Sequence, residues 1–268
     1  MEYVGNLNKL HSRLSSVAEY SLTNDIFTLD FNPLIGTTLN IEYLGEINCI
    51  KCGRKTNKSF SQGYCYPCFM SAPETEECVL RPELCRAHEG FARDMGFAAT
   101  HCLIDHFVYL ARTDAVKVGV TRNTQIPTRW IDQGATEAII LARTPNRYQA
   151  GLIEQSLKKH LPDKTNWRNM LTGKVTDKRP LQEVKQFAKN VGGEILQIYF
   201  EPDNSLQSIN YPLSEIPVKV VSFDLDKSHS IGGVLTGIKG QYLIFDNQNV
   251  INIRKYGGYK VKIKCSNR

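Results

Sequence analysis

The sequence predicts an α+β protein built from several small modules, and three observations support this. Seven of the eight cysteines fall between positions 49 and 102. Residues 106–204 alternate short strand-like apolar runs with runs at helical spacing. From position 205 onward, apolar and polar residues alternate as in β-strands. We therefore expect an N-terminal β-rich segment (1–48), a zinc-binding module (49–105), an α/β core (106–204) and a small barrel-like β-module (205–268).

The composition is that of an ordinary globular protein, with 41% hydrophobic and 22% charged residues among 268. No apolar run approaches the roughly 20 residues that span a bilayer. The N-terminal MEYVGNLNKL lacks the apolar core of a signal peptide. We therefore expect a cytoplasmic protein, in which eight cysteines favour metal binding over a disulfide framework.

The clearest motif is a double C-x2-C pattern. Cys49-Ile-Lys-Cys52 and Cys65-Tyr-Pro-Cys68 are separated by twelve residues. Each pair places two thiolates on one tight turn, and four thiolates close a tetrahedral zinc site. Such a site has no open coordination position, so the pattern predicts a zinc ribbon with a structural role.

A second metal site is also suggested by the remaining cysteines of the cluster. Its expected ligands are Cys78, Cys85, His88 and Cys102, with His101 and His106 as competing ligands. The alternative is that these cysteines are small buried apolar residues and the histidines lie at the surface. The sequence thus predicts one or two structural zinc ions, and Cys265 as a free thiol.

The core segment 106–204 has the pattern strand, strand, helix, strand, helix. FVYL and VKVGV predict a hairpin, and EAIILAR (137–143) predicts a third strand. Thr144-Pro145 then suggests an N-cap and a first-turn proline. Helical spacing follows at Ala150, Ile153, Leu157 and Leu161. A later helix is expected from Pro180 to Gly192, burying Leu181, Val184, Phe187 and Val191.

Residues 106–170 resemble the core of the GIY-YIG nucleases. Val108-Tyr109-Leu110 is similar to the GIY element, and Lys117-Val118-Gly119 is similar to the YIG element. Thr128-Arg129-Trp130 matches the helix that carries the family's arginine, and Glu154 matches its metal-binding glutamate. The family's late asparagine corresponds to Asn166 or Asn169. More broadly, the chain resembles an uncharacterised bacterial family that joins a GYCYPCF zinc module to a KVGVTR…PTRWIDQGA core.

The resemblance implies phosphodiester hydrolysis. Tyr109 orients or deprotonates water, Arg129 offers a planar fork to phosphate oxygens, and Glu154 holds Mg²⁺ or Mn²⁺. The catalytic set it implies is Tyr109, Lys117, Arg129, Glu154 and Asn166. Lys117 departs from the family because it replaces the second tyrosine. A lysine binds phosphate as a point charge, and positions water as a phenol does only if its pKa is strongly lowered.

The positive charge of the chain is concentrated downstream of this core. Residues 156–192 contain nine Lys or Arg and three acids, which accounts for the whole net charge of +6. A concentrated positive field suits a phosphate backbone, although a solvated helix face is the alternative. The residues we expect to contact nucleic acid are Arg122, Lys158, Lys159, Lys164 and Arg168.

Three functions remain open from the sequence. The leading hypothesis is a metal-dependent nuclease acting on DNA or RNA. The second is a zinc-containing nucleic-acid-binding protein without catalysis, favoured by Lys117 and by expected exposed aromatic residues of the β-module, Tyr242, Tyr256 and Tyr259. The third is a protein-interaction scaffold. The simpler alternatives at the site are a packed Tyr109, a structural Arg129–Glu154 ion pair, a core Trp130 and an Asn166 that caps a turn.

Overall fold

The computed structural model describes residues 1–266, which form two compact units. The first unit combines Met1–Met70 with the segment that begins at Asn210, and the second is Ser71–Ile209. The four expected segments therefore do not correspond to separate units, because segments 1–48 and 205–268 contribute strands to one sheet. Pairing between strands some 200 residues apart leaves no local trace in a sequence, which is why the boundaries differ.

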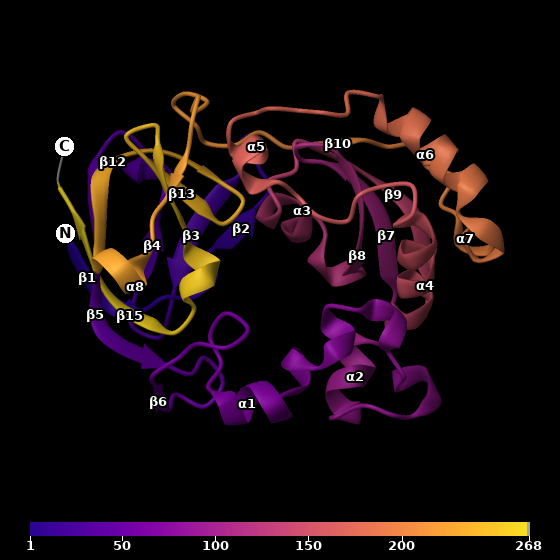
Figure 1. The fold of residues 1–268 in the computed structure, drawn as a ribbon, viewed down its shortest axis with the longest axis horizontal. Helices are drawn as coiled ribbons and strands as arrows, with labels where there is room; N and C mark the ends of the chain where they lie inside the picture. The colour runs from indigo at the N-terminus through magenta and orange to yellow at the C-terminus, as the bar shows by residue number, and fades with distance from the viewer. Residues whose placement is uncertain (267–268) are drawn as a thin grey trace. The chain divides into compact units, whose positions relative to one another are not determined.

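The first unit contains an eight-stranded sheet in the order β1-β15-β5-β12-β13-β14-β11, with β6 paired to β5 (Figure 1). A separate three-stranded sheet has the order β2-β3-β4. The elements of this unit are β1 (Glu2–Asn6), β2 (His11–Arg13), β3 (Glu19–Thr23), β4 (Thr28–Asp30), η1 (Asn32–Leu34), β5 (Thr38–Asn48), β6 (Lys55–Thr56), α1 (Tyr66–Ser71), β11 (Val221–Ser222), α8 (Leu225–Ser228), β12 (Ser230–Lys239), β13 (Tyr242–Phe245), β14 (Asn249–Asn252), η7 (Ile253–Tyr256) and β15 (Tyr259–Cys265).

Alternating burial explains the register of the large sheet. Leu39 and Ile41 of β5 are fully buried, and Ile41 lies opposite Ile263 of β15 and Ile231 of β12. A one-residue slip would turn these side chains to the other face. The expected DNQN turn is confirmed, because Asp246 and Asn247 both have positive φ and join β13 to β14.

Two expectations about the C-terminal segment are wrong. VKVVSFDLD forms only the short strand β11 before the chain turns into α8. Tyr256 and Tyr259 are buried rather than exposed, at 1% and 7% exposure. Their hydroxyls bond to Asp224 at 3.2 Å and Asp226 at 2.9 Å, so these rings pack inside the unit.

The second unit contains a four-stranded antiparallel sheet in the order β10-β9-β7-β8, and α4, α6 and α7 lie on one side of it (Figure 1). Its elements are η2 (Pro73–Thr75), η3 (Glu77–Val79), η4 (Pro82–Leu84), η5 (Ala87–Glu89), α2 (Met95–His101), β7 (His106–Arg112), β8 (Val116–Arg122), η6 (Asn123–Gln125), α3 (Thr128–Asp132), β9 (Glu137–Thr144), α4 (Arg147–Leu157), α5 (Trp167–Leu171), α6 (Leu181–Val191), α7 (Gly193–Tyr199) and β10 (Gln207–Ser208).

The two faces of this sheet differ in chemistry. One face carries Val108, Leu110, Val116 and Val118, which pack on the helices in the main apolar core of the unit. The alternate residues of β7 and β8 point to the opposite face because successive side chains of a strand alternate. Those residues include Tyr109 and Lys117. The alternation of side chains along the strands therefore places these two candidate site residues on the face opposite the apolar core.

The expected helices of this unit are present, with local differences. The expected spacing in α4 is confirmed by the burial of Ala150, Ile153 and Leu157. Its N-cap is Asn146 rather than Thr144, because the Asn146 side chain accepts the N–H of Gln149. Helix α6 spans the expected residues, but Phe187 is 37% exposed. Across residues 1–266, every helix is too short or too polar to span a bilayer.

Candidate functional site

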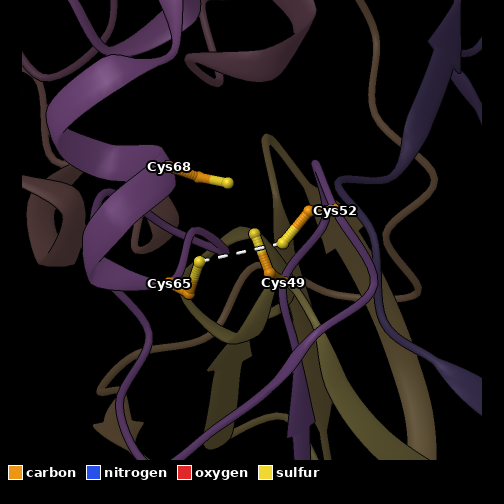
Figure 2. A group of neighbouring side chains, drawn as sticks. All are labelled: Cys49, Cys52, Cys65 and Cys68. Atoms are coloured by element: carbon orange, nitrogen blue, oxygen red, sulfur yellow. Dashed lines mark hydrogen bonds between the residues drawn. The ribbon is translucent and has the colours of Figure 1, made fainter.

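Four cysteines of the first unit converge on one point. Cys49 and Cys52 lie at the turn between β5 and β6, while Cys65 and Cys68 lie at the start of α1 (Figure 2). Their sulfur atoms all lie within 4.8 Å of one another. Gly53, with φ of +70°, closes the first turn by donating its N–H to the Cys49 carbonyl. The expected pairing of the two C-x2-C motifs is therefore present.

The geometry of these four thiols fits zinc. The Sγ atoms of Cys52 and Cys65 are 3.8 Å apart. A tetrahedral ion with Zn–S bonds of about 2.3 Å requires sulfur separations of about 3.8 Å. Although burial opposes ionisation of Cys49, backbone hydrogen bonds from Cys65 and Cys52 lower its pKa to about 6. The cluster can therefore hold a zinc ion, and four ligands make the role structural.

Three more thiols converge in the second unit. Cys78 lies in η3, Cys85 follows η4, and Cys102 caps α2; their sulfur atoms lie within 4.8 Å of one another. Hydrogen bonds from the thiols of Cys102 and Cys78 lower the pKa of Cys85 to about 3. This cluster too can hold zinc.

The histidines expected at this second cluster lie outside it. His88 stacks on Tyr148, with ring centroids 4.3 Å apart. Within residues 1–266, its ring nitrogens are not part of the group formed by the three sulfur atoms. The Nδ1 atom of His101 lies 3.1 Å from the Phe97 carbonyl oxygen. His106 contacts the Ile104 carbonyl through Nδ1. The described ligand set is thus three thiols, without the imidazole expected from the Cys85-x2-His88 spacing.

A polar group occupies the sheet face opposite the apolar core. Tyr109 pairs with Gly119 across β7 and β8, and a Cβ at Gly119 would lie 2.6 Å from the Tyr109 hydroxyl. Only glycine leaves room there for the phenol. Gln133, just after α3, donates its amide N–H to the Tyr109 oxygen at 2.7 Å. Tyr109 is fully buried, and burial raises its pKa, which the nearby Arg129 guanidinium partly opposes.

Lys117 is the buried cation of this group. It is 6% exposed, and among residues 1–266 its amine has no hydrogen-bond or ion-pair partner. Burial, followed by repulsion from Arg129, lowers the pKa of Lys117 to about 8. The carboxylates of Asp114, Asp163 and Glu154 act in the opposite direction from a distance. A substantial fraction of this amine is consequently neutral near pH 8.

Glu154 of α4 acts on this group electrostatically, since its carboxylate influences both Tyr109 and Lys117. It is 8% exposed, and burial raises its pKa, which the nearby Lys158 opposes. Lys158 Nζ lies 3.3 Å from the Glu154 carboxylate and 3.7 Å from that of Asp163. Glu154 therefore pairs with Lys158, and the structural ion pair with Arg129 considered from the sequence is not among the described contacts.

The other candidates from the sequence have different environments. Asn166 is the N-cap of α5, where its side-chain oxygen accepts the N–H groups of Arg168 and Asn169. Arg122 is half-buried, and its electrostatic neighbours are Arg147 and Cys102. Trp130 is buried, as expected. The exposed cations of the downstream segment are Lys159, Lys164, Arg168, Lys174, Lys178 and Arg179, and Arg179 is paired with Asp177.

Sequence reasoning missed Gln133 and Asp163. Gln133 holds the Tyr109 hydroxyl, and Asp163 lies on the loop whose Pro162 carbonyl accepts the N–H of Val118 at the edge strand β8. Neither residue belongs to a spaced motif. Only the position of Gln133 one turn after Arg129 on a helical segment offered a signal.

The fold and its sites define a class: an α+β protein with two thiol clusters that can hold zinc and a buried polar group on one sheet face. The chain belongs to the family described as "Protein of unknown function (DUF2797)", whose model matches residues 36–261. No curated protein and no solved structure matches the chain.

Proposed function

We propose that the second unit is a metal-dependent nuclease-like hydrolase that acts on phosphodiesters of DNA or RNA. One observation carries the proposal: Arg129 and Glu154 both act electrostatically on Tyr109 and Lys117, which share the sheet face opposite the apolar core. Buried ionisable side chains whose pKa values are shifted by burial and by a nearby charge, as those of Tyr109 and Lys117 are, are typical of a catalytic site. The resemblance of residues 106–170 to the GIY-YIG core points the same way.

The roles follow from the environments. Arg129 is half-buried and offers a guanidinium fork to two phosphate oxygens. Lys117, whose pKa is lowered to about 8, takes a proton from the attacking water in its neutral form. Tyr109 is too buried to contact substrate, so it acts with Gln133 to position Arg129. This assigns to Lys117 the proton transfer that the resemblance would give to a phenol.

Glu154 is the residue that would hold a divalent cation. Carboxylate oxygen suits Mg²⁺ or Mn²⁺, and a single carboxylate leaves coordination positions for water and phosphate. The bound ion would neutralise charge that develops on the phosphate. The ion pair between Lys158 and Glu154 must break before Glu154 can bind a cation. Asp163, whose carboxylate lies 3.7 Å from Lys158 Nζ, can then pair with Lys158 instead.

A panel of labelled single-stranded DNA, duplex DNA, RNA and hairpin substrates tests the proposal. We expect cleavage that requires Mg²⁺ or Mn²⁺ and that falls by at least 100-fold in Glu154→Gln and Lys117→Met. Glu183→Gln, an exposed acid on α6, is the matched control and should cleave normally. Cleavage that persists in Glu154→Gln would exclude this site.

The second candidate function is nucleic-acid binding without hydrolysis. The exposed cations Lys164 and Arg168 favour it, and Arg168 also stacks on the Trp167 ring at 4.3 Å. We expect Lys164→Ala to weaken binding uniformly across sequences and to reduce the salt dependence by about one counterion. Binding of the wild type with no cleavage on the whole panel would favour this function over the hydrolase.

A further inference from the structure

A buried arginine of the second unit lacks an acidic partner. Arg147, the first residue of α4, is only 8% exposed, and no carboxylate among residues 1–266 pairs with it. Its Nη1 atom lies 3.5 Å from the Cys78 sulfur, and its Nη2 donates to the His101 carbonyl at 3.1 Å. Its backbone N–H also bonds to the Cys102 carbonyl. The guanidinium is therefore directed at the three-thiol cluster.

This arrangement requires a negative charge at the thiols. Burying an unpaired charge costs several kcal/mol even after relaxation, so buried arginines are found with anions. Three neutral thiols supply none, whereas one ionised thiol among them, or one divalent metal ion held by all three as thiolates, leaves a single negative charge. A divalent ion bound by three thiolates carries a net charge of about −1, which one guanidinium balances.

We propose that Cys78, Cys85 and Cys102 bind a second, thiophilic metal ion as thiolates, and that Arg147 is the cation that balances this centre and donates an N–H to its sulfur. The chain supplies three ligands here, against four from Cys49, Cys52, Cys65 and Cys68. The second centre therefore keeps one coordination position for a ligand from solution, and it releases its metal to a chelator before the first centre does.

The centre also supports the helix that carries Glu154. Residues 147, 151 and 154 share one face of α4, because they are four and three positions apart. Arg147 meets Cys78, Gly151 abuts the backbone of Pro82 and Glu83, and Glu154 is influenced by Glu83. The metal thus fixes the segment that covers this face, whether or not the unit is a hydrolase.

Metal content of the full chain loaded with Zn²⁺ or Co²⁺ tests the proposal. We expect two ions in the wild type and one each in Cys85→Ser and Cys49→Ser, while Cys265→Ser, a lone buried thiol, keeps two. In a chelator titration, Arg147→Met should weaken the second ion by 10–100-fold, the usual effect of removing a partner of a metal ligand. Arg143→Met removes an exposed arginine paired with Asp105 and serves as the control.

The outcomes separate cleanly. Two ions in the wild type with a selective loss in Cys85→Ser support the centre, and faster amide exchange of residues 147–157 in that variant supports its role in holding α4. A single ion that Cys85→Ser retains would overturn the proposal, as would a disulfide between two of the three cysteines in the purified chain. If Cys85→Ser does not fold, the chelator titration still tests Arg147. A second ion held as tightly by Arg147→Met as by the wild type would overturn the role of Arg147.

Discussion

Replacing Gly151 by alanine tests the packing on which the second cysteine cluster and Glu154 both depend. Gly151 lies inside α4, where alanine normally stabilises a helix by about 1 kcal/mol. A Cβ at this position would lie less than 3.0 Å from three backbone atoms of Pro82 and Glu83, including Glu83 Cα at 2.8 Å. Since an ordinary carbon contact is about 3.5–4.0 Å, the backbone of η4 must move by about 1 Å.

The clash should outweigh the gain in helix propensity. Overpacking of this kind costs typically about 1–3 kcal/mol, and the upper end applies because backbone cannot rotate away as a side chain can. After subtracting the ~1 kcal/mol gain from alanine, we expect a net destabilisation of about 2 kcal/mol. For a unit of this size that corresponds to a fall in Tm of about 6 °C.

Tryptophan fluorescence is the assay of choice. The two tryptophans of the chain, Trp130 and Trp167, both lie in the second unit, so their emission follows its unfolding alone. Gly96→Ala in α2 is the control, because a Cβ there meets only the Asp94 carboxylate at 3.2 Å. A Gly151→Ala variant that is as stable as the wild type, or more stable, would refute the close contact between α4 and η4.

Three further predictions follow from the site. Lys117→Met should stabilise the second unit at pH 7 by up to about 3 kcal/mol, since a buried amine whose pKa falls from 10.5 to about 8 destabilises the fold wherever it must be protonated. The free energy of unfolding of the wild type should rise relative to that of this variant above pH 8, and the two should be equal near pH 10.5. Denaturant titrations that give the same difference at every pH would contradict the lowered pKa of Lys117. Gly119→Ala should displace the buried Tyr109 hydroxyl, lower any cleavage rate at least 10-fold and destabilise the second unit by about 1–3 kcal/mol, measured by steady-state kinetics and fluorescence. Zinc removal should unfold the Cys49 turn, and circular dichroism that is unchanged after removal of all metal would show that the zinc is not structural.

Local patterns in the sequence were sufficient for much of this protein. The spacing of Cys49, Cys52, Cys65 and Cys68 predicted a four-thiol site, because each C-x2-C turn brings its own two sulfurs together. Periodicity predicted the hairpin of β7 and β8, the third strand and α6. Alternation of side chains along the hairpin also determines that Tyr109 and Lys117 share a face.

The tertiary structure decided which partners the candidate side chains contact. Nothing local to His88 indicates that it stacks on Tyr148 instead of joining the thiols, and nothing local to Arg147 indicates that it turns toward Cys78. The sequence by itself determined which groups are present and which strands carry them. Burial determined their charge and pKa, because desolvation and neighbouring charges arise only when segments distant along the chain pack together.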